Sequence, residues 1–265
     1  MLLQGKVAVI HGGGGAIGGA VARVFAREGA RVYLCGRTRA KLDRVVHDIV
    51  AAGGRAEATE VDALDEHAIE HHVEGVALRA GRIDIALNAV GFAHVQGTPF
   101  VDLPLADFAY PIEACARTNF LTAQAVARRM VDQGSGVILT LSTPGARLSG
   151  QGFLGNGVAS AAIEAFSRIL AGELGASGVR VVCLRPDAIP GALAESHSRD
   201  VFAGVAARAG TTIEAMLAGR AEHATLLKRL PTLQQVAEAA AFFASDRAGA
   251  MTGTVANLTC GSIVD

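Results

Sequence analysis

The feature that most constrains the fold is a run of four glycines that directly follows a short apolar segment near the start of the chain. Residues 7–10 are Val, Ala, Val and Ile, and after His11 the chain continues with Gly12 to Gly15. From Ile17 onward, apolar residues recur at the spacing of one helix face. A strand, a glycine turn and a helix in this order predict a phosphate-binding site, because glycines let the backbone approach a pyrophosphate and the helix N-terminus offers free N–H groups. The alternative is a mobile surface loop.

Composition limits the kinds of partner that the protein has. The 265 residues are 51% hydrophobic and 18% charged, with a net charge of −1 and no long basic or acidic block. Neither nucleic acid nor a membrane surface is therefore expected as a partner. The apolar runs are far shorter than the about 18 residues of a membrane helix, and the first residues lack the features of a signal peptide. Scattered cysteines without a CxxC pair are typical of a reduced protein, so we expect a cytoplasmic location.

Strand-like and helix-like segments alternate along the chain, which is typical of a parallel sheet with helices on both faces. Strands are expected near residues 6–10, 31–35, 56–60, 83–88, 136–141, 179–184 and 254–258. Helices are expected near residues 17–28, 39–52, 65–79, 104–130, 157–175 and 233–244. The pattern predicts one α/β domain over residues 1–265.

Residues 187–230 break this regular alternation. The segment has interrupted helical stretches and carries His197, His223 and several arginines. A long insertion after a late strand is often functional, so we expect a substrate lid here. The alternative is a surface excursion without a role.

The chain resembles the classical short-chain dehydrogenase/reductase family along nearly its whole length. Its glycine turn is similar to the family's Thr-Gly-x-x-x-Gly-x-Gly. Gly12 and Gly18 are kept, whereas His11 replaces the Thr and Ala16 replaces the middle Gly. The resemblance implies a Rossmann-type, doubly wound sheet of seven parallel strands in three α/β/α layers, with a dinucleotide across its topological switch point.

Other segments carry the resemblance further along the chain. Asn88 and Gly91 match the end of the family's Asn-Asn-Ala-Gly run, and Pro186 and Ile189 match the stretch that flanks the nicotinamide, with Asp187 in a place that is usually Gly. The family's contact to the adenine falls on the Asp of Val61-Asp62. The cofactor-binding residues that we predict are Gly12, Gly14, Gly15, Ala16, Ile17, Gly18, Arg37, Asp62, Asn88, Ala89, Gly91, Pro186 and Ile189.

The residues after the second predicted strand indicate which dinucleotide binds. An acidic side chain at this point hydrogen-bonds the adenosine ribose and favours NAD. Here the strand runs into Gly36, Arg37, Thr38 and Arg39, with no carboxylate before Asp43. A guanidinium can make planar, charge-assisted hydrogen bonds to a 2′-phosphate. We therefore expect NADP(H), bound through Arg37. The alternative is that both arginines are solvated residues at a helix start.

The residues that usually perform proton chemistry in this family are replaced. The resemblance implies a catalytic Tyr-x-x-x-Lys pair, an upstream Ser and an Asn on the preceding long helix. Ungapped alignment puts Thr143 in the Ser place, Asn156 in the Tyr place, Ser160 in the Lys place and Cys115 in the Asn place. Neither of the chain's two tyrosines is followed by a lysine at the required spacing. We therefore expect a site that hydrogen-bonds a ligand oxygen without the family's usual proton relay.

Other residues are candidates for the missing proton donor or for metal binding. His94, on the loop after residues 83–88, and Asp187, beside the nicotinamide, are the candidates for proton transfer. Cys115 is the less favoured candidate for a nucleophile. His67 and His71 are spaced for one helix face but lack a third ligand, so no metal site is predicted. Together with His72, they are expected on a solvated face.

Three functions remain open. The first is an NADP(H)-dependent oxidoreductase with a rewired proton donor, or with a substrate that needs little acid catalysis. The second is a non-redox cyclase, isomerase or lyase on the same fold. The third is a non-catalytic NADP(H) sensor or pseudoenzyme subunit. In each case the ligand is a small molecule. The resemblance implies an oligomer that pairs the two long central helices, and the small, apolar residues around 158–166 fit such a homodimer or homotetramer.

Overall fold

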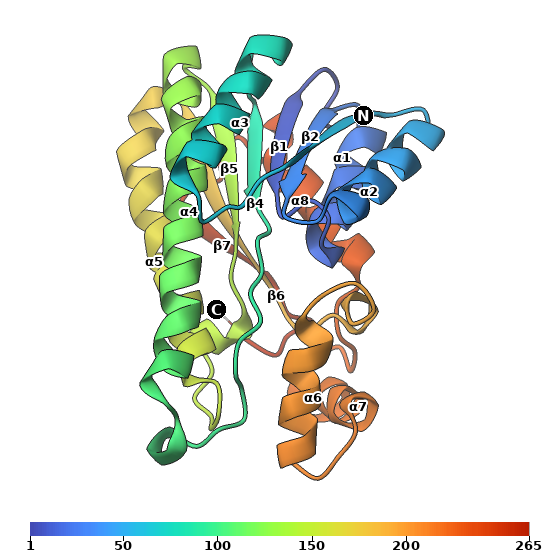
Figure 1. Cartoon of the computed structure of the whole chain (residues 1–265), viewed down its shortest axis with the longest axis vertical. Coiled ribbons are helices and arrows are strands. Elements are labelled where there is room, and N and C mark those ends of the chain that lie inside the picture. Colours follow the sequence, from blue (N-terminus) through green and yellow to red (C-terminus); the bar gives the residue numbers. More distant parts are fainter. Residues whose placement is uncertain (265) are drawn as a thin grey trace.

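Seven strands form one parallel sheet in the computed structural model, which describes residues 1–264 (Figure 1). The strands are β1 Val7–His11, β2 Arg31–Gly36, β3 Arg55–Glu60, β4 Ile85–Asn88, β5 Gly136–Leu141, β6 Val179–Pro186 and β7 Thr254–Leu258. Their order in the sheet is β3-β2-β1-β4-β5-β6-β7, with every neighbouring pair parallel. The predicted Rossmann-type fold is confirmed, and the order reverses between β1 and β4.

Helices cover both faces of the sheet. Figure 1 shows α1, α2 and α8 on one face and α3, α4 and α5 on the other, with α6 and α7 beyond the end of β6. The bounds are α1 Ala16–Arg27, α2 Arg39–Ala51, α3 Glu66–Ala80, α4 Leu105–Gln133, α5 Leu154–Leu174, α6 Ser198–Arg208, α7 Ile213–Ala224 and α8 Leu233–Ala244. Short 3₁₀ turns lie at Phe100–Asp102, Pro144–Ala146, Gly175–Ser177, Pro190–Ala192 and Asp246–Ala248.

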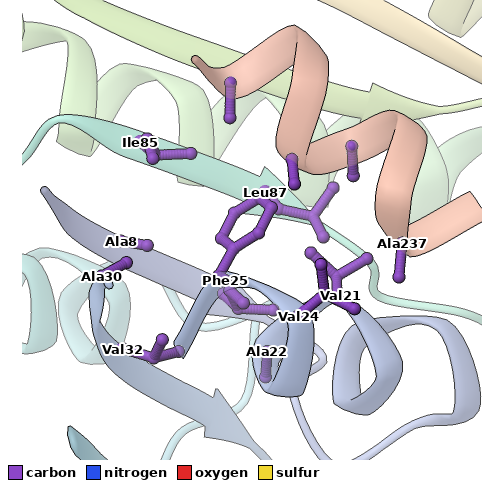
Figure 2. Close-up of a cluster of buried hydrophobic side chains, with 14 of the residues drawn as sticks. Ala8, Val21, Ala22, Val24, Phe25, Ala30, Val32, Ile85, Leu87 and Ala237 are labelled. Carbon is purple, nitrogen blue, oxygen red and sulfur yellow. The ribbon is translucent and has the colours of Figure 1, made fainter. Parts of the chain in front are cut away.

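The apolar runs of the strands supply two cores, one on each face. Side chains alternate along a strand, so Ala8 and Ile10 of β1 pack with α1 and α8, whereas Val7 and Val9 pack with α3 and α4. Figure 2 shows Phe25 of α1 beside Leu87 of β4 in the first of these cores. Burial of both faces explains why the inner strands β1 and β4 are apolar rather than alternately polar, whereas the edge strand β3 is polar and largely exposed.

The segment between β6 and α8 is helical but broken, as its sequence predicts. It contains α6 and α7, which are bent by 85° relative to each other. Within residues 1–264, no single helix is long and apolar enough to cross a membrane; α6 and α7 satisfy that test only when they are counted together as a bent pair.

One prediction about α3 is wrong. His67 and His71 are exposed as expected, but His72 is only 4% exposed. It lies on the inner face of the helix with Ile69, Val73 and Val76, all of them buried. The spacing of these apolar residues places position 72 on the buried stripe, and this helical periodicity outweighs the polarity of the imidazole.

His11 and His72 meet in the core beneath the sheet's carboxyl edge. The His11 Nδ1 atom lies 3.1 Å from the Cys35 Sγ atom, and the two imidazole rings contact edge to face with their centroids 6.3 Å apart. Burial lowers the pKa of His11 to about 3, with a smaller contribution from His72, and it lowers the pKa of His72 to about 4. Both rings are therefore neutral near pH 7.

These two buried imidazoles predict a loss of stability in mild acid. An unfolded His binds a proton below about pH 6.5, but the folded state excludes that proton until far lower pH, so the free energy of unfolding falls as the pH drops. We expect His11→Thr, which introduces the family's residue, to reduce the loss between pH 7 and pH 5 by about 2 kcal/mol. Urea unfolding at the two pH values measures this loss. His47→Gln, at an exposed site on α2, is the control that keeps the wild-type loss, and an equal loss in His11→Thr would contradict the explanation.

Candidate functional site

A cavity of about 780 Å³ lies along the carboxyl edge of the sheet. Its walls come from the ends of β1, β2, β4, β5 and β6 and from the α6–α7 segment. β2 and β4 lie on opposite sides of β1, and the strand order reverses at this point. In doubly wound folds this reversal leaves a crevice in which ligands bind.

The glycine turn forms one wall by very close backbone packing. Gly12 has a φ of +78°, and a Cβ atom at this position would lie 2.5 Å from the carbonyl oxygen of Ala89. A Cβ atom on Gly18 would clash with the Gly12 carbonyl oxygen. Gly15 caps α1 without a side-chain hydrogen bond, so backbone N–H groups of the first helical turn remain available at the cavity. This is the geometry that a pyrophosphate requires.

The end of β2 presents one unpaired guanidinium. Arg39 bonds both carboxylate oxygens of Asp43, at 2.8 and 3.0 Å, and the carbonyl oxygen of Ala58. Arg37 lines the cavity, is exposed, and has no side-chain hydrogen bond or ion pair with residues 1–264. The two neighbouring arginines thus differ, and Arg37 is the one that can contact a bound ligand.

The end of β4 shapes the cavity from behind. The buried Asn88 amide donates to Thr122 Oγ1 at 3.1 Å, and its carbonyl oxygen accepts from the Val90 N–H at 3.0 Å. These bonds fix the turn that presents Ala89 and Gly91. All the predicted cofactor residues line the cavity except Asn88 and Gly18, which lie behind its wall and set its shape.

Thr143, Asn156 and Ser160, the residues predicted to replace the family's catalytic ones, form one hydrogen-bonded cluster. Thr143 Oγ1 accepts from the Asn156 amide at 3.3 Å and from the Gly145 N–H at 3.2 Å. Both of its lone pairs are then used, so the hydroxyl donates to Ser160 Oγ at 2.8 Å. All three side chains face the cavity. None of these groups exchanges a proton readily near neutral pH.

His94 reaches the same cavity as a firmly held neutral ring. Its Nδ1 atom is 2.9 Å from the Phe92 carbonyl oxygen and therefore carries the proton, which leaves Nε2 to accept from the Gln96 amide at 2.7 Å. Burial lowers the pKa of His94. The ring of His197, at the start of α6, lies edge to face with it at a centroid separation of 6.4 Å. Burial also lowers the pKa of His197.

Asp187 lines the cavity, but its carboxylate is already paired. Arg220 of α7 donates to it from Nε at 2.6 Å and from Nη2 at 2.9 Å. The Ser262 hydroxyl also donates to it. The carboxylate is only 1% exposed. The pair ties α7 to the end of β6, and this geometry favours an anchoring role for Asp187 over proton transfer.

Comparison with known proteins identifies the family. The family model described as Enoyl-(Acyl carrier protein) reductase matches residues 14–262. The chain belongs to the short-chain dehydrogenase/reductase family. It is 34% identical over 255 residues to an uncharacterized oxidoreductase from Mycobacterium tuberculosis, a match that covers 95% of this chain and 89% of that one.

Two other short-chain dehydrogenase/reductase relatives show the range of named activities. The chain is 29% identical over 253 residues to (+)-cis,trans-nepetalactol synthase from Nepeta racemosa. This match covers 95% of this chain and 88% of the synthase. The solved structure of a 7α-hydroxysteroid dehydrogenase, complexed with NADH and 7-oxo glycochenodeoxycholic acid, matches with a TM-score of 0.86 and 28% identity. That match covers 99% of this chain and 96% of the other. The fold therefore carries a nicotinamide cofactor in a relative.

The structure of this short-chain dehydrogenase/reductase chain favours neither a reactive thiol at Cys115 nor a metal site. Cys115 lines the cavity from α4, and burial raises the pKa of its thiol to about 11, so it stays protonated near neutral pH. Among residues 1–264, no three His, Cys, Asp or Glu side chains gather closely enough to hold a metal ion.

Sequence reasoning missed several cavity residues. Gln96, Phe153 and Arg220 reach the cavity from three separate segments, and no local motif marks them. The one available signal was the interrupted helical pattern of 187–230, which contains His197 and from which a substrate lid is predicted.

Proposed function

We propose that this chain is an NADP(H)-dependent oxidoreductase that acts on a small molecule through an atypical active site. The observation that carries the proposal is one continuous cavity that joins the glycine turn, Arg37 and the Thr143–Asn156–Ser160 cluster. When bound there, the dinucleotide supplies or accepts a hydride. The oxidoreductase relative and the family model support this class of chemistry.

The residues present fit a dinucleotide phosphate. The glycine turn packs against the backbone of Ala89, where a Cβ atom on Gly12 would clash, and the open start of α1 offers N–H donors to a pyrophosphate. Arg37 has no competing partner within residues 1–264, whereas Arg39 is paired with Asp43. Arg37 would therefore bind a 2′-phosphate and favour NADP(H) over NAD(H).

The cluster orients a ligand oxygen but does not supply a proton. Asn156 and Ser160 retain a donor N–H and a hydroxyl toward the cavity, so a carbonyl or hydroxyl can be held there by neutral hydrogen bonds. His94 stays the candidate for proton exchange through Nε2, which would require the Gln96 amide to move away. We assign Asp187 to anchoring α7, because Arg220 holds both of its oxygens.

A non-redox reaction is the second candidate, and one relative favours it. The relative from Nepeta racemosa is named a synthase rather than a dehydrogenase. A neutral cluster that only orients a ligand is compatible with a cyclase or isomerase for which the bound dinucleotide forms part of the pocket wall. A non-catalytic sensor of NADP(H) is the third possibility that the residues leave open.

Assembly and location stay predictions. Phe120 of α4 is 52% exposed and Ile169 of α5 is 58% exposed, which favours pairing of these two helices with those of a second copy. We propose a homodimer or homotetramer in the cytoplasm.

The first test of this proposal concerns cofactor choice. We expect NADPH to bind more tightly than NADH, and Arg37→Ala to remove about 1.5–3 kcal/mol of NADPH binding free energy while leaving NADH binding unchanged. Titration calorimetry with both nucleotides measures this difference. Arg39→Ala is the matched control, since that guanidinium is paired with Asp43, and it should preserve the preference. Equal affinities in the wild type would refute NADP(H) specificity.

The second test restores the family's proton relay. The double change Asn156→Tyr and Ser160→Lys places an acidic hydroxyl beside an ammonium group, and positioned acid–base catalysis contributes about 10²–10⁴-fold. We expect a gain of this order in NADPH oxidation by simple ketones, followed by absorbance, with a smaller gain for Asn156→Tyr alone. A wild-type turnover above about 1 s⁻¹ on such a ketone would show that the native site already has an efficient acid.

A further inference from the structure

The part of the cavity beyond the Thr143–Asn156–Ser160 cluster is walled by apolar side chains. They come from three segments: the loop after β4, the segment between β5 and α5, and the α6–α7 segment. Their apolar side chains include Phe92, Leu148, Phe153, Phe202, Met216 and Leu217, and the same segments also contribute the polar Gln96, Gln151 and Glu195. Aromatic and aliphatic walls of this kind fit a molecule whose surface is mostly carbon.

The loop after β4 contacts both of the other segments at the border of the cavity. The Gly97 N–H donates to the Gly152 carbonyl oxygen at 2.5 Å, and a Cβ atom on Gly152 would lie 2.6 Å from the Cα atom of Gly97. Arg208 of α6 donates to the Gln96 carbonyl oxygen at 2.8 Å. A ligand in this region is therefore shielded from water on several sides, and each charge that it carries must find a partner in the wall.

Among the described residues that border this apolar region, none offers a free positive charge to such a ligand. Among the cavity-lining residues that the structure describes, Arg37 and Lys41 lie at the ends of β2 and α2, beside the glycine turn. The other arginine is Arg220, whose guanidinium faces Asp187 through two hydrogen bonds at 2.6 and 2.9 Å. Asp187 thus cancels the charge of Arg220, which borders the apolar region.

We propose that the ligand is an uncharged, mostly apolar ketone or alcohol, and that Asp187 sets this preference by neutralising Arg220. The ligand's oxygen would lie against the Thr143–Asn156–Ser160 cluster, and the ligand's carbon skeleton would fill the apolar region. A carboxylate or phosphate in the same place would lose its hydration without gaining an ion pair. The inference rests on the proposed function only in taking this cavity as the ligand site beside the dinucleotide.

The test compares two probes of nearly equal shape, the neutral ketone 2-acetylnaphthalene and the anion 2-naphthoate. Calorimetry first establishes NADP⁺ binding, so a failure of the proposed cofactor function is seen separately. The probes are then titrated into NADP⁺-loaded protein, in which the ketone cannot be reduced. We expect wild-type protein to bind the ketone at least ten-fold more tightly than the anion. Failure of the ketone to bind, or equal binding of the anion, overturns the assignment of the ligand class.

Variants of the ion pair test the role of Asp187. Asp187→Asn leaves Arg220 unpaired, and we expect the ketone-to-anion affinity ratio to fall at least ten-fold. The double change Asp187→Asn with Arg220→Gln removes both charges and should return the ratio to the wild-type value. Arg199→Gln, an exposed cation on α6, is the control that leaves the ratio unchanged. Should Asp187→Asn not fold, Asp187→Gly, the residue usual in the family, takes its place. An unchanged ratio in the folded single variant refutes the role of Asp187.

Discussion

The site depends on the contact between the backbone of the glycine turn and the end of β4. The Ala89 N–H donates to the His11 carbonyl oxygen at 2.8 Å, and only the missing side chain of Gly12 lets the two segments approach this closely. This contact joins the two strands at which the sheet order reverses. From this contact, α1 runs to one side of the sheet and the 88–91 turn lies toward the other. The space between them is the one that we assign to a dinucleotide.

The chemistry of the site depends on how α5 lies against β5 and β6. The neutral cluster at the cavity is backed by charges deeper in the protein, where buried Arg185 donates to Glu164 at 2.7 Å and the Ser142 hydroxyl donates to the same carboxylate at 2.9 Å. These bonds fix the helix so that Asn156 and Ser160 meet Thr143. The buried charges of Arg185 and Glu164 therefore position the cluster. The cluster itself offers a ligand neutral hydrogen-bonding groups that do not gain or lose a proton near pH 7.

Local patterns predicted the fold and many residues that line the cavity, but not the long-range pairs. The alternation of strand-like and helix-like segments located every strand, and the glycine spacing located the turn. His72 was misjudged because its polarity was weighed above its place on the buried stripe of α3. The resemblance identified Asn88 but not that its amide faces Thr122, away from the cavity. The pairing of Asp187 with Arg220 joins positions far apart in the sequence, and no local pattern contains it.

The central claim is that a dinucleotide lies across the carboxyl ends of β1, β2 and β4. Hydrogen–deuterium exchange with and without NADPH tests this most directly, because a bound pyrophosphate and ribose cover specific backbone amides. The account predicts slower exchange on binding in residues 12–18, 36–38 and 89–91, with little change in α3 on the far side of the sheet. Saturating NADPH that leaves these three segments unprotected, or that protects a different edge of the sheet, would contradict it.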